Sequence, residues 1–558
     1  MIYRKITLGL FAAFCLIISL IVITPSGMRR CENNLCGEYY FGAHEHDGIW
    51  HIAVSEMLIH SSKWQMPTFA SENLTGYNYG IDLLVAGLSR LTTISTKDWY
   101  FRGLPLIWGI GIIYYLLQFA KRYRPTTSYP WFLLIFSFFG SSFSYFLNLF
   151  HNGTIWGSSG LLSMQALQVM TNPQLGLSLL LLVVYLNRSM NNQKTSYKES
   201  LVLGLLVAAS FALKFYTGVI LAFIVFVNFI LELKSNSKNW LQVITRHLVM
   251  TIPVILVAFW LYQPTGKPFP LTWKPFATVT PIIEDSQLFY MPSIAQRLYT
   301  TRGIALFGLN LLITIVYILM NYGIRVAAIA VPQLNISRDN KRIRMLLVSG
   351  SIAGLLINIL FVQNGIWWNT VQFLHVSLFL SGFLAAEVID NAYIATKSRT
   401  AKLLIITTLL LILLPNNADI LKTFTTNKGT SYISSEELET LSVLKKLPEG
   451  VVFTPAFMPG EKRVDMTPLL SQLYDTAYIT AYTGKVTYFA DKTQLDLLSI
   501  PYIEREKMVL NYDCKILDEV DYLYEEHRNR YAYRFEPCKR ELSELFKNTS
   551  GSIYEVLN

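Results

Sequence analysis

The sequence predicts a multi-pass α-helical membrane protein that ends in a small α/β domain outside the membrane. Three observations lead to this prediction. Of the 558 residues, 52% are hydrophobic and only 15% are charged, values that a soluble chain of this length rarely reaches. Apolar segments recur from the N-terminus to residue 415. Residues 1–415 carry 30 Lys and Arg against 15 Asp and Glu, whereas residues 416–558 carry 17 against 22.

The first apolar segment follows a short basic N-terminus. Residues 6–24 are almost wholly apolar, and no small-x-small cleavage site precedes Arg29 and Arg30, so we interpret the segment as a retained span. Several later segments have only about 15 residues, fewer than the ~20 that a perpendicular helix needs, so we expect about 11–13 segments that do not all cross fully. The later segments lie at residues 80–94, 99–120, 129–150, 172–187, 200–213, 215–232, 247–263, 303–322, 345–362, 369–390 and 401–415.

Positive charges indicate the orientation of these segments. Lys and Arg concentrate in the loops after residues 120, 187, 232, 322 and 390, and the intervening loops carry fewer of them. Because cytoplasmic loops are enriched in positive charge, we expect a cytoplasmic N-terminus and an extracytoplasmic tail. Residues 25–79 then form a first outer loop, and residues 264–300 form a second long one. With no nucleic-acid motif in the chain, we expect no nucleic-acid partner.

Four of the five cysteines lie outside the apolar segments. Cys31 and Cys36 follow the first span, and Cys514 and Cys538 lie in the tail. Two local pairs on an exported face suit an oxidising compartment, so we predict disulfides Cys31–Cys36 and Cys514–Cys538. Four free thiols or a metal site are the alternatives, although C-x4-C without further nearby ligands is a weak zinc signature.

The tail, residues 416–558, has the short elements of a small α/β domain. Ser434 or Ser435 can cap a helix that ends near Lys446, with glutamates in its first turn. Residues 451–453 and 520–524 have the composition of strands. The tail has no nucleotide-binding glycine loop and no nucleophile motif, so we expect it to recognise or support rather than to catalyse.

The first outer loop concentrates polar chemistry in residues 44–51, where two acids and three histidines fall within eight positions. If this run is helical, His44, Asp47, His51 and Ser55 lie on one polar face, as in a helix resting on a membrane surface. A solvated polar loop end is the alternative. Because residues 44–51 belong to an outer loop beside a membrane bundle, we favour the helix.

Several short motifs follow in a recognisable order. His46-Asp47-Gly48 and the predicted helix to His60 precede Pro67 and Tyr77-Asn78-Tyr79, and Asn172-Pro173-Gln174 and Lys214-Phe215-Tyr216-Thr217-Gly218 come later. This order resembles the glycosyltransferase C (GT-C) superfold, the lipid-linked-sugar glycosyltransferases of the protein-mannosyltransferase and aminoarabinose-transferase kind. The resemblance implies sugar transfer from a polyprenyl-phosphate donor, with an essential acid in the first outer loop. Glu45 and Asp47 match the usual adjacent acid pair only loosely, which leaves a metal requirement open.

The chemistry of such a transfer suggests roles for these residues. The acceptor hydroxyl must lose a proton as it attacks, so a carboxylate within hydrogen-bond reach is the expected base. Asp47 is the first candidate and Glu45 the second. A displacement with one such base inverts the anomeric configuration. His46 and His51 are candidate substrate-binding residues, and His51 can orient Asp47 by a hydrogen bond.

The leaving lipid phosphate needs positive charge nearby. Lys214 separates two apolar segments, where a lysine is costly unless it reaches water, a headgroup or an anion. We therefore expect it near the outer membrane surface, facing the same cavity as Asp47; snorkelling to the interface is the alternative. Arg297, Arg302 and His375 are weaker candidates for the same role.

A divalent ion, Mg²⁺ or Mn²⁺, is the one cofactor that we consider. Glu45, Asp47 and His44 are its candidate ligands, although surface or hydrogen-bonding roles suit the histidines better. The expected partners are a polyprenyl-phosphate-linked sugar, the bilayer, and an acceptor that is a glycan, a lipid or a protein.

Two other classes of function fit parts of the sequence. A transporter or lipid flippase is also polytopic, but it should show inverted hydropathy repeats and charges within several spans, and neither is evident. A receptor or scaffold explains the tail but not an acid-rich outer loop beside a many-segment bundle. The sequence therefore favours an integral-membrane glycosyltransferase.

Overall fold

The computed structural model describes residues 2–557 except 62–63, 157–171, 191–195, 236, 263–270, 285–290, 335–337, 364–366, 427–428, 461–466, 527–530 and 539. The chain forms two compact units. The first comprises Met1–Val22, Leu106–Trp260 and Pro264–Thr426, and the second comprises Ile23–Pro105, Leu261–Gln263 and Asn427–Asn558. The second unit thus includes the first outer loop as well as the tail. The domain boundary that we predict from the sequence, at residue 416, lies inside a helix that continues to Thr426.

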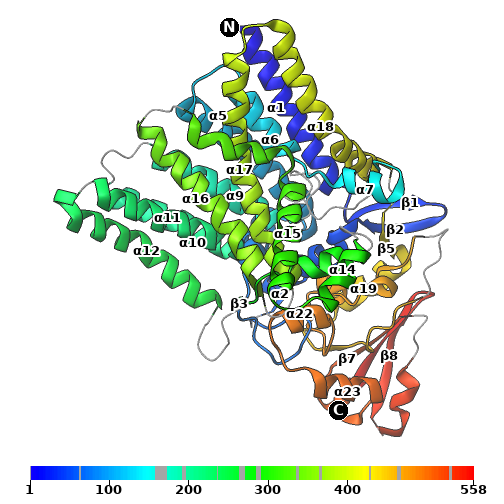
Figure 1. The fold of residues 1–558 in the computed structure, drawn as a ribbon. Coiled ribbons are helices and arrows are strands. Elements are labelled where there is room, and N and C mark those ends of the chain that lie inside the picture. Colours follow the sequence, from blue (N-terminus) through cyan, green and yellow to red (C-terminus); the bar gives the residue numbers. More distant parts are fainter. Residues whose placement is uncertain are drawn as a thin grey trace. The chain divides into compact units, whose positions relative to one another are not determined.

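The first unit is a helical bundle (Figure 1). Among its described residues, eight helical stretches of the chain are long and apolar enough to cross a membrane, which confirms the multi-pass class. The remaining apolar segments form helices shorter than 18 residues, and the predicted segment 129–150 is divided into two helices, Tyr129–Phe139 and Ser144–Asn152. Its elements are α1 (Ile2–Ile23), α5 (Leu104–Tyr123), α6 (Tyr129–Phe139), α7 (Ser144–Asn152), α9 (Pro173–Ser189), α10 (Tyr197–Leu213), α11 (Phe215–Ser235), η3 (Ser237–Asn239), α12 (Trp240–Tyr262), β3 (Leu271–Trp273), α13 (Val279–Glu284), α14 (Pro292–Thr300), α15 (Gly303–Tyr322), η4 (Gly323–Gln333), α16 (Arg338–Leu360), β4 (Phe361–Gln363), α17 (Trp367–Ala395) and α18 (Arg399–Thr426).

The described part of the second long outer loop is folded. β3 pairs with β4 in an antiparallel ribbon, and α13 and α14 follow. Val279, Ile283 and Leu298 of these helices are buried in one apolar cluster with residues of α15 and α17. A 37-residue loop whose helices pack into the core of the bundle does more than connect two helices. Asp285 of this loop, and residues 157–171 of the loop after α7, lie outside the described residues.

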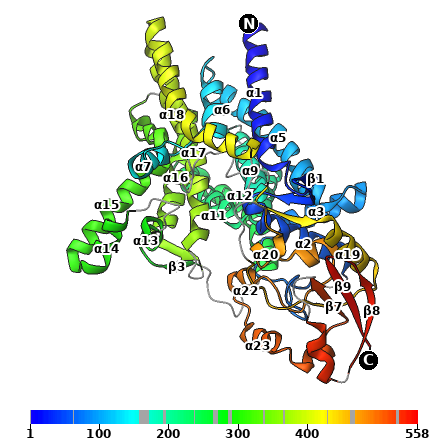
Figure 2. The same cartoon turned by 90° about the vertical axis from the view of Figure 1, so that its right-hand side faces the viewer.

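The second unit combines helices with two small sheets. One sheet has the strand order β1-β2-β5, and the other has the order β6-β7-β9-β8, with β6 and β7 parallel and the remaining pairs antiparallel. Figure 2 shows β7, β9 and β8 side by side. Its elements are β1 (Met28–Glu32), β2 (Leu35–Tyr40), η1 (Gly42–Glu45), α2 (Asp47–His60), α3 (Gly80–Thr92), α4 (Thr96–Asp98), η2 (Trp99–Gly103), β5 (Ser431–Ser434), α19 (Ser435–Lys446), β6 (Val452–Phe453), α20 (Leu470–Leu473), α21 (Tyr478–Thr483), α22 (Lys492–Leu497), α23 (Ile503–Asn511), η5 (Cys514–Asp518), β7 (Tyr522–Glu526), η6 (Ala532–Cys538), β8 (Glu541–Lys547) and β9 (Gly551–Leu557).

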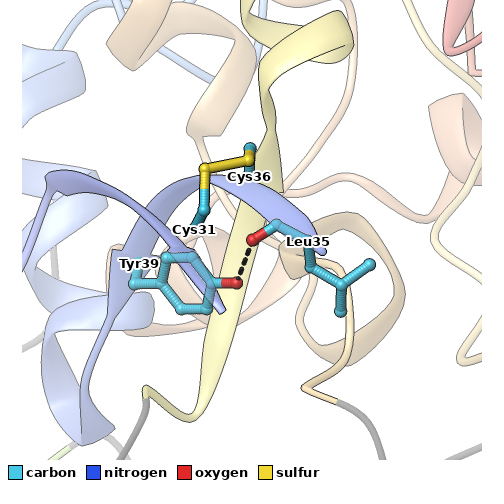
Figure 3. Close-up of a disulfide and its surroundings, with 4 residues drawn as sticks. All are labelled: Cys31, Leu35, Cys36 and Tyr39. Atoms are coloured by element: carbon cyan, nitrogen blue, oxygen red, sulfur yellow. Dashed lines mark hydrogen bonds between the residues drawn. A yellow bond between two sulfur atoms is a disulfide. The ribbon is translucent and has the colours of Figure 1, made fainter. Parts of the chain in front are cut away.

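Both predicted disulfides are present. Cys31 and Cys36 face each other across the β1–β2 hairpin with their Cα atoms 4.0 Å apart, and the hydroxyl of Tyr39 donates to the carbonyl of Leu35 beside them (Figure 3). Cys514 and Cys538 bridge η5 and η6 with a Cα separation of 5.3 Å. Both separations lie below the ~7 Å limit for a disulfide, and the prediction is confirmed.

The elements predicted for the tail are also confirmed. α19 starts at Ser435, and the side chain of Ser434 accepts a hydrogen bond from the backbone N–H of Glu437. This N-cap satisfies a donor that the first helical turn leaves unpaired. The two predicted strands appear as β6 and β7, which pair with each other.

A buried carboxylate connects the first outer loop to the tail within the second unit. Glu56 of α2 accepts a hydrogen bond from Thr96 at 2.6 Å and pairs with Lys445 of α19 at 2.9 Å and with His60 at 3.3 Å. Burial opposes ionisation, but the hydrogen bonds and the charge of Lys445 outweigh it and lower the pKa of Glu56 to about 2. The ionised carboxylate therefore stabilises the folded unit.

We expect Glu56→Gln to lower the free energy of unfolding by about 2–3 kcal/mol at pH 7, because one pKa unit corresponds to about 1.4 kcal/mol. A lowered folded-state pKa means that the stabilisation is complete above the ordinary value of 4.5 and is lost as the pH falls toward 2. Unfolding of purified protein at pH 7 and pH 3 measures the difference.

The control is Glu506→Gln, which removes a more exposed pair with Lys492 at 2.7 Å. It should change the free energy by less than about 1 kcal/mol. A Glu56→Gln protein as stable as the wild type at pH 7 would contradict the assigned role.

Candidate active site

The helix predicted in the first outer loop is present as α2, but it is not a surface helix. Each residue from Gly48 to Met57 is buried, on the polar and the apolar side alike. α2 packs against α3 and against α21 of the tail. The expected polar face is therefore turned inward, where its side chains hydrogen-bond to neighbouring elements. The prediction of an exposed polar face is wrong, because tail residues cover the helix.

Asp47 is the exception, since its side chain remains 46% exposed at the first position of α2. Its Oδ1 lies 3.3 Å from Nδ1 of His46, and Nε2 of the same ring lies 3.0 Å from Oδ1 of Asp491 in the tail. Both ring nitrogens therefore face carboxylate oxygens. Burial disfavours the charged ring, but the charge of Asp491 and the contacts with both acids outweigh it and raise the pKa of His46 to about 11. His46 is thus an imidazolium between two carboxylates.

Asp491 has an unusual backbone conformation, and hydrogen bonds fix its position. Its φ is +54°, a left-handed conformation that Asp tolerates better than most residues. Its side chain caps α22 by accepting from the N–H of Gln494 at 3.2 Å. Its own N–H and that of Lys492 donate to Asp475 at 2.8 and 2.9 Å. Burial, with a contribution from the charge of Asp491, raises the pKa of Asp475.

His51, one turn after Asp47, is engaged elsewhere. Its Nδ1 lies 2.9 Å from Oδ1 of Asp82 in α3, and its Nε2 lies 3.3 Å from the hydroxyl of Tyr77. Burial and the charges of Asp82 and Asp47 raise the pKa of Tyr77 well above its ordinary value. Both ring nitrogens of His51 therefore have partners, and His46 supplies a hydrogen bond to Asp47.

The candidate metal ligands do not form a chelating set. Nδ1 of His44 lies 2.6 Å from Oγ of Ser26, and its ring packs against Phe101 at 5.2 Å between centroids. Glu45 is buried, with 1% exposure. Within the described part of the chain, no three His, Cys, Asp or Glu side chains are arranged to hold a metal ion. The side chains of Glu45, Asp47 and His44 therefore do not fit a divalent ion as they are arranged here.

Lys214 lies in the first unit, at the break between α10 and α11 that the sequence predicts. The residue is 6% exposed, in an extended conformation that ends α10. Its Nζ lies 5.5 Å from the ring centroid of Tyr216, whose hydroxyl donates to Gln363 of β4 at 2.6 Å. A buried ammonium at the start of a candidate membrane helix is costly, so its position is consistent with an anion-binding role.

The other candidate cations of the first unit differ in their surroundings. His375 of α17 is close enough to Lys214 and Arg325 for both positive charges to act on it. Arg297 of α14 is exposed. Arg302 is also exposed and donates to the carbonyls of Tyr299 and Thr301 at 2.7 and 3.0 Å. Lys214 and His375 thus belong to one neighbourhood.

No protein family and no curated protein matches the sequence, but solved structures match its fold. The archaeal oligosaccharyltransferase AglB from Archaeoglobus fulgidus, in complex with an inhibitory peptide and a dolichol-phosphate, is 12% identical, with 94% of this chain and 70% of AglB covered at a TM-score of 0.50. ArnT from Cupriavidus metallidurans in the apo state is 9% identical. The match covers 98% of this chain and 97% of ArnT at a TM-score of 0.48. The Archaeoglobus fulgidus oligosaccharyltransferase in complex with Zn and sulfate is 11% identical. The match covers 97% of this chain and 72% of that structure, also at a TM-score of 0.48.

The chain has the GT-C fold. The fold that the sequence motifs suggested is therefore confirmed, and with it the multi-pass membrane class with a small domain at the C-terminus. At this identity the match establishes the fold and leaves the activity to be argued from the side chains.

Sequence reasoning missed two acids that contact the histidines of this candidate site. Asp82 lies within an apolar segment, where an acid in the first helical turn is a signal that we did not use. Asp491 precedes Lys492-Thr493-Gln494, a pattern typical of a helix N-cap. No local pattern could have paired Asp491 with His46, because 445 positions separate them.

Proposed function

We propose that this chain is an integral-membrane glycosyltransferase that moves a sugar from a polyprenyl-phosphate donor to an extracytoplasmic acceptor. The GT-C fold that it shares with AglB carries this proposal, because AglB was solved with a dolichol-phosphate, a lipid of the donor class. The placement of Asp47 supports it independently. A half-exposed carboxylate in an otherwise buried polar network suits a group that must meet a substrate.

Asp47 is the proposed general base. The acceptor hydroxyl oxygen forms a bond to the anomeric carbon as the bond from that carbon to the lipid phosphate breaks, and the hydroxyl proton passes to Asp47. Attack opposite the leaving group inverts the anomeric configuration. The imidazolium of His46 contacts Asp47 and orients it, and Asp491 holds His46. His46 is therefore a positioning residue rather than a direct substrate ligand.

Lys214 is the proposed partner of the leaving phosphate. The lipid phosphate takes the bonding electrons when the glycosidic bond breaks, and a fixed positive charge stabilises it. Lys214 supplies that charge from a site where water is scarce, so its attraction for the phosphate is stronger than in bulk solvent. No step of the proposal passes through a metal ion, because the candidate ligands do not form a set that would hold one.

The direct test uses purified protein and radiolabelled sugars on polyprenyl phosphate. Loss of label from the lipid, with transfer to an acceptor or to water, is the expected result. A transporter or flippase is the second candidate because it is also polytopic. It would move the labelled lipid across a vesicle bilayer and leave the sugar attached.

We also propose that the N-terminus is cytoplasmic and that the tail is extracytoplasmic. The loop charges favour this orientation, and the two disulfides suit an oxidising compartment. Alkaline phosphatase fused after Asn558 should therefore be active, and green fluorescent protein fused there should be dark. Fluorescence without phosphatase activity would overturn the orientation.

A further inference from the structure

Three helices of the first unit line an apolar cavity that the proposed reaction does not use. α10, α11 and α12 line a volume of about 360 Å³. Its walls include Val207 of α10, Phe226 and Phe229 of α11, and Leu248 of α12. Phe226 and Leu248 are 57% and 59% exposed, so the cavity opens on the surface of the bundle. In a protein that spans a bilayer, such a surface faces lipid.

One polar side chain, His247 of α12, lies in this apolar wall. The residue is 8% exposed, and its Nδ1 lies 3.0 Å from the carbonyl oxygen of Val243. A carbonyl only accepts, so Nδ1 carries the proton and Nε2 of the neutral ring has a free lone pair. Among the described residues, Nε2 has no hydrogen-bond partner. A buried acceptor without a donor is energetically costly, and a ligand that donates a hydrogen bond would offset that cost.

A cationic cluster adjoins the same histidine. His247 and Met250 also line a small second cavity, together with Glu232, Arg246 and Arg342. Glu232 pairs with Nη2 of Arg246 and with Nη1 of Arg342, each at 3.2 Å. Two guanidinium groups thus share one carboxylate. The N–H donors and positive charges of two guanidinium groups at this end of the cavity suit an anion such as a phosphate.

This cluster lies far from Lys214. Lys214 directly precedes α11, and Glu232 lies in its last turns. At ~1.5 Å per residue, the two positions are separated by about 27 Å along the helix. Because α11 is long and apolar enough to cross a membrane, the cluster lies at the opposite membrane face from Lys214. The cationic cluster is therefore separate from the proposed donor phosphate site.

We propose that this cavity binds a bilayer phospholipid whose headgroup carries a hydrogen-bond donor. An acyl chain lies along Phe226 and Phe229, and the phosphate lies beside Arg246 and Arg342. The headgroup donor pairs with Nε2 of His247. Phosphatidylethanolamine supplies an ammonium and phosphatidylglycerol supplies hydroxyls, whereas phosphatidylcholine has the same phosphate without a donor. The proposal does not depend on sugar transfer.

Native mass spectrometry of the purified full chain tests this site with dioleoyl forms of the three lipids. We expect phosphatidylethanolamine or phosphatidylglycerol to be retained roughly three- to tenfold more than phosphatidylcholine, the range that one net hydrogen bond supplies. His247→Phe keeps an aromatic ring and removes the acceptor, so the preference should fall below about twofold. His151→Phe, the same change at an exposed histidine of α7, should keep the preference.

Equal retention of the three lipids by the wild-type protein overturns the proposal, as does an unchanged preference in His247→Phe. If His247→Phe does not yield folded protein, Ala222→Phe provides a second test, because Ala222 lines the cavity on α11. The larger side chain fills the volume and should abolish the preference. A preference that survives this filling also overturns the proposal.

Discussion

Asp47→Asn should reduce sugar transfer by roughly 100-fold or more, the scale expected when a general base is lost. The amide keeps the shape of the side chain and can still contact His46, but it does not accept the acceptor's proton. Glu45→Gln should cost less, because Glu45 is buried and a water-borne acceptor does not reach it. The measurement is the initial rate of transfer from a labelled polyprenyl-phosphate donor, at matched expression.

Asp98→Asn is the matched control for this experiment. The Asp98 side chain is 47% exposed, close to the 46% of Asp47, and it also contacts a charged side chain, Arg102, at 2.7 Å. Because Asp98 contacts Arg102 rather than the His46 network, its substitution should leave the rate within about twofold of the wild type. An Asp47→Asn protein that retains most activity would move the chemistry elsewhere, with Glu284 of α13 the next residue to substitute.

Lys214→Met should lower kcat/KM for the lipid-linked donor by about 10- to 100-fold, the effect of losing one charge-assisted contact with a phosphate. Methionine keeps much of the apolar length of the lysine side chain and removes the charge. The fold should be preserved, because a buried ammonium is costly and its removal relieves that cost. Thermal unfolding in the same detergent separates the loss of activity from a loss of structure.

Lys402→Met is the control for that variant. Nζ of Lys402 lies 4.9 Å from the ring centroid of Tyr393, a cation–π contact like that of Lys214 with Tyr216 at 5.5 Å. If the cation–π contact alone matters, both variants should behave alike. A Lys214→Met protein that transfers sugar at the wild-type rate would exclude the phosphate-binding role.

Local patterns in the sequence were enough to predict much of this molecule. The apolar segments became helices because backbone groups inside a bilayer must bond within their own segment. The N-cap at Ser434 and the hairpin disulfide Cys31–Cys36 depend on residues no more than five positions apart. α2 ends at His60, where the sequence predicts it.

Long-range packing decided the rest. The sequence places Asp47 in the first outer loop and identifies its candidate chemistry. Only the tertiary structure turns the polar face of α2 inward, pairs His51 with Asp82, and brings Asp491 of the tail to His46. Side-chain spacing along one helix does not predict these contacts, because each partner comes from a distant segment whose position depends on how the whole unit packs. The sequence by itself determined the membrane class and identified Asp47 as the candidate base, and the tertiary structure decided which charges surround that carboxylate.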